Sequence, residues 1–125
     1  MITHLFVYGT LRPGEQRWPF LQPFVLDEGR DDSVAGVLYD TGHGYPAAKF
    51  DRPGLVHGRV YPLNTDRLDE CLELLDEVEG AVQDLFRRVA ITTSGGIEAW
   101  AYEYCNDADF RDIASGDWLA SRLPD

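Results

Sequence analysis

A short apolar run leads into a tight turn at residues 4–12, HLFVYGTLR. Residues 4–8 are rich in aromatic and branched side chains, which predicts a buried strand, and Gly9 ends the run. Glycine lets a backbone approach its surroundings closely, and consecutive N–H groups in such a turn can point at one anion. We therefore expect a strand that delivers an anion-binding turn. The motif alone leaves an ordinary structural turn open as the alternative.

Further strands are predicted on the C-terminal side of this stretch. Alternating apolar residues place them over 33–40, 45–50, 55–63, 86–93 and 98–105. Ser94-Gly95-Gly96 separates the last two and is a strong hairpin signal. Residues 10–22, with their prolines and aromatics, are expected to form a loop or a short helical turn.

One strong helical pattern follows residues 55–63. Thr65 or Asp66 can cap this helix, and Gly80 is suited to end it. The apolar residues between them share one stripe, at spacings of three and four: Leu68, Cys71, Leu72, Leu75 and Val78. A short helix is also expected within residues 115–123. These elements predict an α+β fold, a small mixed, mostly antiparallel β-barrel with one main helix and a short C-terminal helix.

The composition predicts one globular domain over residues 1–125, because 44% of the residues are hydrophobic and the length suits one core. The net charge of −11 has the wrong sign for nucleic acid or an anionic membrane, so neither is expected as a partner. No apolar stretch approaches the roughly 20 residues that span a bilayer. No export signal is visible, and Cys71 and Cys105 are expected as free thiols. We expect a cytoplasmic protein.

Metal and nucleophile chemistry lack candidates in this sequence. His4, His43 and His57 are far apart, and none has a ligand partner at the spacing of a known metal site. No serine lies in a nucleophile elbow, and Cys71 falls on the apolar helical stripe. The absence of a heptad repeat argues against coiled-coil assembly and leaves the oligomeric state open.

Glu79 is the candidate for acid–base chemistry. It lies at the predicted C-terminal end of the main helix, where the helix dipole and the nearby Asp76 and Glu77 oppose ionisation. The pKa of its carboxyl group is therefore expected to be raised, as proton transfer near neutral pH requires. A solvated helix-end side chain is the alternative. Asp76 and Glu77 are expected to be surface charges.

Taken together, these motifs resemble the γ-glutamylcyclotransferase-like family, which includes γ-glutamyl cyclotransferases, γ-glutamylamine cyclotransferases and AIG2-like proteins. The matching segments run through most of the chain: residues 6–12 (FVYGTLR), 38–40 (LYD), 44–46 (GYP), 58–61 (GRVY), 75–80 (LDEVEG), 86–88 (FRR), 101–102 (AY) and 115–118 (SGDW). The order YGTL, LDxxEG and aromatic-x-Arg is more specific than any one of these motifs.

The resemblance implies an enzyme that needs no cofactor and no metal. Its substrate would be a small γ-glutamyl compound, whose α-amine attacks its own γ-carbonyl to form 5-oxoproline and release an amine or amino acid. In the implied site, Glu79 is the catalytic acid and base. The implied substrate contacts are the turn residues Tyr8, Gly9, Thr10 and Leu11, together with Arg88. Arg12 and Arg87 are the alternatives to Arg88 as the cation that offsets the negative charge of the chain where an anionic substrate enters.

Phe86 departs from the family pattern, because relatives often carry Tyr-x-Arg where this chain has Phe86-Arg87-Arg88. Any contact that needs the phenol hydroxyl is missing, which affects the choice of substrate more than the reaction. The alternative to an enzyme is a module of the same fold that binds a small metabolite or a protein without turnover.

Overall fold

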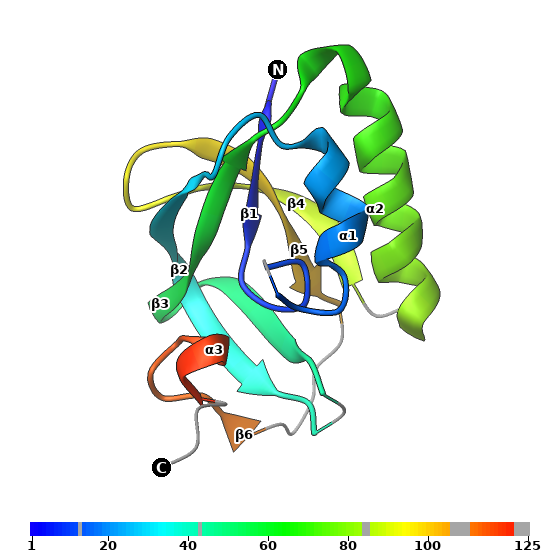
Figure 1. Ribbon diagram of the computed structural model, residues 1–125. Helices are drawn as coiled ribbons and strands as arrows, with labels where there is room; N and C mark the ends of the chain where they lie inside the picture. The colour runs from blue at the N-terminus through cyan, green and yellow to red at the C-terminus, as the bar shows by residue number, and fades with distance from the viewer. Residues whose placement is uncertain (13, 43, 84–85, 106–110, 122–125) are drawn as a thin grey trace.

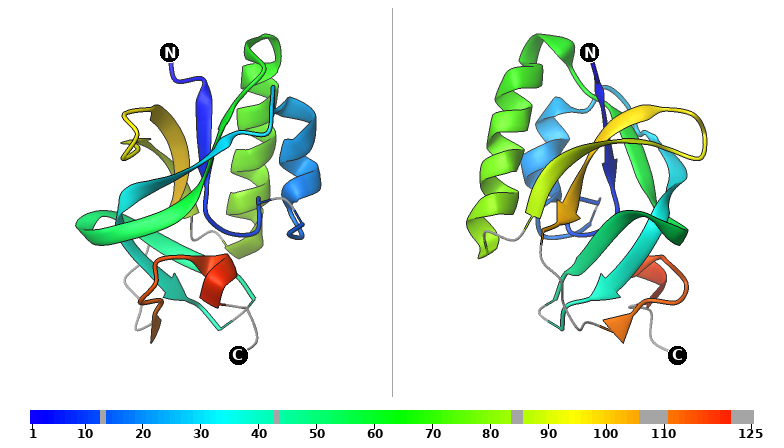
Figure 2. Two further views of the ribbon diagram at one scale, coloured as in Figure 1. Left: turned by 60° about the vertical axis from the view of Figure 1, so that its left-hand side comes forward. Right: turned by 180° about the vertical axis from the view of Figure 1, so that it is seen from behind.

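In the described part of the chain, six strands form one sheet that curls into a half-barrel (Figures 1 and 2). The computed structural model describes residues 1–12, 14–42, 44–83, 86–105 and 111–121. The strands are β1 (His4–Val7), β2 (Arg30–Asp40), β3 (Pro46–Pro62), β4 (Phe86–Thr92), β5 (Glu98–Tyr104) and β6 (Arg111–Asp112). Their order is β4-β5-β1-β3-β2-β6, and every neighbouring pair is antiparallel except β1 with β5. The predicted α+β class with a mixed, mostly antiparallel sheet is confirmed.

Two helices cover one side of this sheet. The short α1 (Trp18–Leu21) and the long α2 (Leu68–Gln83) lie side by side, and α2 packs against β4 (Figures 1 and 2). Single turns of 3₁₀ helix follow α1 (Gln22–Phe24) and precede α2 (Thr65–Arg67). At the other end of the molecule, α3 (Trp118–Ser121) lies near β2 and β3 (Figure 1). The predicted short C-terminal helix is therefore confirmed.

β1 is buried on both faces because it lies in the middle of the sheet. Leu5 and Val7 pack with side chains of α1 and α2. Phe6 and Tyr8 pack in a second cluster, with buried side chains of β2, β3 and β5. The predicted helical stripe fills the first of these clusters, and Leu68, Cys71, Leu72 and Leu75 are all buried there. The alternation along β1 therefore fixes which side chains of the strand face each half of the core.

Several predicted boundaries of strands and helices are wrong. The expected strands 45–50 and 55–63 are one strand, β3, and residues 51–54 bulge out of its pairing with β2 between Ala35 and Gly36. Asp51 and Gly54 turn the chain there with φ of 63° and 128°. The helix α2 also continues past Gly80 to Gln83, because glycine inside a helix costs only about 1 kcal/mol.

The start of the helix also differs from the expectation. Asn64 caps the 3₁₀ turn that leads into α2, and its side chain accepts a hydrogen bond from the Asp66 backbone N–H. Thr65 and Asp66 lie inside this turn and do not cap it. The hairpin around Ser94 is confirmed. His43 and residues 122–125 lie outside the described residues. Within the described part of the chain, no helix is both long and apolar enough to cross a membrane.

Candidate active site

A cavity of about 30 Å³ lies where the turn after β1 meets α2, β4 and β5. Its lining consists of residues 6–11, Arg17, residues 45–46, Glu79, Phe86 and Tyr102. The structure therefore brings together five of the predicted site residues: Tyr8, Gly9, Thr10, Leu11 and Glu79.

The turn after β1 is built as expected. The Arg12 N–H donates to the Gly9 carbonyl at 3.0 Å, which closes a β-turn and leaves the N–H groups of Thr10 and Leu11 outside that hydrogen bond. A Cβ atom on Gly9 would lie 2.6 Å from Cγ of Pro46, so only glycine fits this close approach. Both central residues of the turn are buried against the cavity.

Glu79 is buried, with 7% of the residue exposed. Burial raises the pKa of its carboxyl group to about 7, and the neighbouring Arg17 opposes this rise. The predicted direction of the pKa shift is confirmed, but the predicted cause is wrong. Glu79 lies four residues before the end of α2, and desolvation rather than the helix end disfavours its ionised form.

Arg17 is a site residue that the sequence analysis missed. One of its terminal nitrogens lies 3.2 Å from Oε2 of Glu79, and the two side chains are 15% and 10% exposed. Its backbone N–H donates to the Thr10 carbonyl at 2.8 Å, so the chain after the turn folds back onto the turn itself. No periodic pattern marks this residue, because α1 is only four residues long.

Aromatic rings form the rest of the wall. The hydroxyl of Tyr8 donates to the Tyr102 carbonyl at 2.5 Å, and burial together with the negative charge of Glu79 keeps the pKa of Tyr8 well above its ordinary value. The Phe86 ring lies 6.1 Å from that of Tyr45 and 5.6 Å from that of Tyr104, in edge-on contacts. Phe86, which lacks the phenol hydroxyl, therefore lies on the lining of the cavity.

Arg88 is the predicted contact that the structure does not bring to the cavity lining. Its guanidinium donates to both carboxylate oxygens of Asp76, at 2.9 and 3.2 Å, and lies 4.3 Å from the centre of the Trp100 ring. Asp76 also accepts a hydrogen bond from the Tyr102 hydroxyl at 2.7 Å. Asp76 is exposed, as expected of a surface charge, and its hydrogen bonds also link α2 to β4 and β5.

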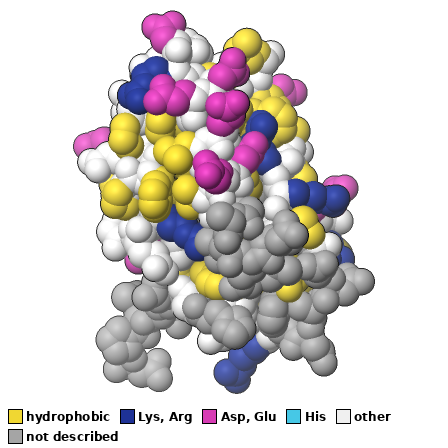
Figure 3. Space-filling model, turned by 90° about the vertical axis from the view of Figure 1, so that its right-hand side faces the viewer, with side chains coloured by type: hydrophobic (Ala, Val, Ile, Leu, Met, Phe, Trp, Pro, Cys, Tyr) yellow, Lys and Arg dark blue, Asp and Glu magenta, His cyan; other side chains and the backbone are white. Residues whose placement is uncertain are grey.

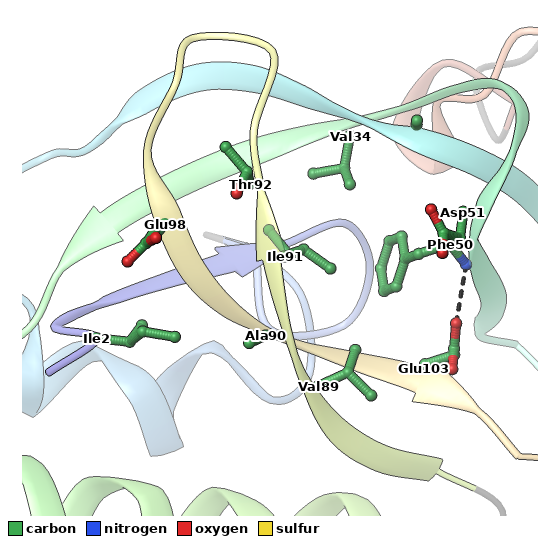
Figure 4. Close-up of a pocket in the computed structure, with 11 residues that line it drawn as sticks. Ile2, Val34, Phe50, Asp51, Val89, Ala90, Ile91, Thr92, Glu98 and Glu103 are labelled. Carbon is green, nitrogen blue, oxygen red and sulfur yellow. Dashed lines mark hydrogen bonds between the residues drawn. The ribbon is translucent and has the colours of Figure 1, made fainter.

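A larger hollow of about 560 Å³ lies between the β4–β5 hairpin and strands β2 and β3 (Figure 4). Figure 4 shows Val34, Phe50 and Ile91 pointing into it. Its described lining includes three carboxylates and no basic side chain, and Glu103 accepts a hydrogen bond from the Phe50 N–H at 3.0 Å. The negative charges of these carboxylates repel an anion, so this hollow is poorly suited to an anionic ligand.

The surface around α1 and α2 is strongly acidic. Acidic side chains gather on this face beside hydrophobic ones (Figure 3). The exposed carboxylates of α2 are Asp69, Glu70, Glu73, Asp76 and Glu77. Because this field repels anions, a cationic group at the cavity becomes an important determinant of anion binding.

The fold and the site define an α+β domain in which a buried carboxylic acid faces the turn after a central strand, an arrangement suited to proton transfer. The chain belongs to the gamma-glutamyl cyclotransferase, AIG2-like family, whose model matches residues 5–120. This is a family of cyclotransferase enzymes, as the sequence resemblance implied.

One relative by sequence supports this assignment, and two solved structures share the fold. The gamma-L-glutamyl-butirosin B gamma-glutamyl cyclotransferase of Niallia circulans is 37% identical over 96% of this chain and 78% of its own length. An uncharacterized protein of Pyrococcus horikoshii is 27% identical, with a TM-score of 0.75 over 97% of this chain and 93% of its own. A mouse AIG2-like protein, 16% identical over 86% of this chain and 80% of its own, shares the fold with a TM-score of 0.62.

Proposed function

We propose that the protein cleaves a γ-glutamyl amide by cyclisation. The α-amine nitrogen of the substrate attacks the γ-carbonyl carbon, so a C–N bond forms and the five-membered ring closes. The original amide C–N bond then breaks, and the products are 5-oxoproline and a free amine or amino acid. The reaction moves protons and needs no oxidant, reductant or protein nucleophile.

Glu79 is the group that we assign to these proton transfers. As a carboxylate it takes the proton that the α-amine must lose, and as a carboxylic acid it returns this proton to the leaving nitrogen. The observation that carries the proposal is that Glu79 is buried on the lining of the cavity, beside the turn after β1. This burial raises the pKa of Glu79 to about 7, so both forms are populated near neutral pH. A general acid and base of this kind contributes about 10²- to 10⁴-fold in rate.

The turn after β1 is assigned to substrate binding. The N–H groups of Thr10 and Leu11, which take no part in the hydrogen bond that closes the turn, are donors of the kind that hold a carboxylate or stabilise the oxyanion on the γ-carbonyl. Holding the amine against the carbonyl contributes as well, because well-oriented ring closure lowers a barrier by roughly 7 to 11 kcal/mol at best. The small aromatic cavity suits this positioning task. Both cysteines are free, in keeping with the cytoplasmic location that we propose.

The test is 5-oxoproline release from a panel of γ-glutamyl dipeptides and γ-glutamylamines. Glu79→Gln should lower kcat by at least 100-fold. Glu77→Gln, a change of the same kind at an exposed position of the same helix, should retain activity. Circular dichroism and thermal melting would check that both variants keep the fold.

The outcomes separate the enzyme from a binding module. Release by the wild type that is lost in Glu79→Gln supports the proposal and identifies the leaving group. No release from any compound, with clear binding of one of them, would replace the proposal by a metabolite-binding function. Release that persists undiminished in Glu79→Gln would remove Glu79 from the reaction.

A further inference from the structure

The guanidinium of Arg17 has an incomplete set of partners. It is 15% exposed, and its ion pair with Glu79 uses one nitrogen of Arg17 and one carboxylate oxygen at 3.2 Å. Among the described residues, no other side-chain or backbone acceptor contacts its remaining N–H groups. A guanidinium has five donors in a planar fork that matches a carboxylate, so most of its binding capacity is unused. A largely buried cation in this state is suited to bind an anion.

The backbone of Arg17 holds the guanidinium at the cavity. The Arg17 N–H is tied to the Thr10 carbonyl at 2.8 Å, and the next residue, Trp18, packs its ring 5.4 Å from that of Tyr61. The long side chain beyond this anchor retains its rotatable bonds. Arg17 can therefore change partners within the cavity while its backbone stays in place.

Substrate binding requires such a change. Arg17 and Glu79 both lie on the lining of this small cavity, so a glutamyl group that enters it meets their ion pair. The reacting α-amine, which is mostly protonated in solution, must also reach Glu79. Two cations then compete for one carboxylate, and their mutual repulsion is strong in a buried site. The competition ends if an anionic group of the same substrate binds the displaced cation.

We propose that Arg17 binds a carboxylate of the γ-glutamyl substrate and that its ion pair with Glu79 breaks when this contact forms. This inference rests on the proposed function. The resting Arg17–Glu79 pair is exchanged for two substrate contacts, carboxylate with Arg17 and amine with Glu79. Arg17 thereby selects substrates with a carboxylate and makes Glu79 accessible to the amine only when such a substrate is bound.

Two carboxylates can fill this role. Every γ-glutamyl compound has an α-carboxylate beside its α-amine, and γ-glutamyl peptides have a second carboxylate on the leaving amino acid. Three compounds distinguish these sources. γ-Glutamylalanine carries both carboxylates, γ-glutamylethylamide carries only the first, and the α-carboxamide of γ-glutamylethylamide carries neither.

The experiment compares wild type, Arg17→Gln and the control Arg67→Gln on these compounds, by KM and kcat or by competitive inhibition for a compound that is not turned over. Arg67 pairs with Glu70 on the surface, so its substitution removes the same charge away from the cavity. A charge-assisted contact predicts that Arg17→Gln raises KM about 10- to 100-fold on compounds with the relevant carboxylate and leaves the carboxamide unaffected.

The pattern across compounds identifies the source. A rise for γ-glutamylalanine and γ-glutamylethylamide alike assigns the α-carboxylate to Arg17. A rise for γ-glutamylalanine alone assigns the carboxylate of the leaving amino acid. An unchanged KM for all compounds, or an equal rise that includes the carboxamide, overturns the proposal, because Arg17 would then act without recognising a carboxylate.

Two further measurements keep the proposal testable. If Arg17→Gln does not fold, Arg17→Lys is the variant to test, because lysine keeps the positive charge but lacks the planar guanidinium. Arg17→Lys should raise KM less than about 10-fold, and only on the compounds that carry the relevant carboxylate. Wild type that releases no 5-oxoproline refutes the proposed function, whereas the Arg17 contact is then judged by binding alone. Equal wild-type affinity for all three compounds would refute that contact.

Discussion

Glu79→Gln should stabilise the folded protein at neutral pH while it removes the proposed catalytic group. Burial raises the pKa of Glu79 from 4.5 to about 7, so the folded protein keeps this proton over a pH range in which the unfolded chain has already lost it. Between these pKa values the folded state binds more protons, and its free energy of unfolding falls as the pH rises. Glutamine does not ionise and escapes this loss.

The magnitude follows from the size of the pKa shift. Each pKa unit corresponds to about 1.4 kcal/mol, so a shift from 4.5 to about 7 costs the wild type about 3 kcal/mol once both states are ionised. The stability gained by Glu79→Gln over wild type should therefore increase by about 2 to 3 kcal/mol between pH 5 and pH 8. Most of this increase should fall below pH 7.5.

Urea unfolding of both proteins at half-unit steps from pH 5 to pH 8 measures this difference directly. Glu77→Gln serves as the control, because Glu77 is exposed and its substitution should give a nearly constant difference from wild type. A difference that does not change with pH for Glu79→Gln would refute burial as the cause of the raised pKa. A difference that moves in the opposite direction would mean that Arg17 outweighs burial.

Three other substitutions or reagents probe the site and its surroundings. Gly9→Ala should destabilise the protein by about 1 to 3 kcal/mol in thermal or urea melts, because its Cβ would lie 2.6 Å from Cγ of Pro46; an unchanged melt would show that the turn yields easily. Arg88→Gln should leave KM for a γ-glutamyl substrate within about threefold, because its guanidinium is held outside the cavity lining by a partly exposed ion pair, and a larger rise would restore it as a substrate contact. A thiol reagent should modify Cys105 rapidly and Cys71 only on unfolding, since burial raises the pKa of the Cys71 thiol to about 11; two rapid reactions in the native protein would contradict this.

The parts of the fold that follow local rules could be predicted from the sequence. The strand over residues 4–8, its turn and the hairpin around Ser94 each depend on a few neighbouring residues whose backbone preferences agree. Boundaries were less predictable where tertiary structure overrides a local signal. Asp51-Arg52-Pro53-Gly54 has the composition of a turn between strands, yet β2 pairs with the chain on both sides of it and makes one strand of the two.

The spacing of apolar residues in α2 indicates the burial of Glu79, whereas its position near the predicted helix end does not. Leu72, Leu75 and Glu79 follow one another at intervals of three and four, so Glu79 continues the buried stripe. An acidic residue at such a position must carry a raised pKa or a buried partner, and Glu79 has both. The burial that perturbs this group was therefore readable from periodicity alone.

Arg17 illustrates the opposite limit. Its place in the site depends on the hydrogen bond from its N–H to Thr10, seven residues earlier, and on the packing of α1 beside α2, which no periodicity in residues 10–22 specifies. Glu79 could be recognised because a helix repeats its environment every three or four residues, whereas Arg17 reaches the cavity through an irregular loop that is folded once. The periodicity of a helix thus predicts a buried acid, whereas the cation that pairs with it can come from an irregular segment. In this protein that cation is Arg17, the residue that we expect to discriminate among substrates.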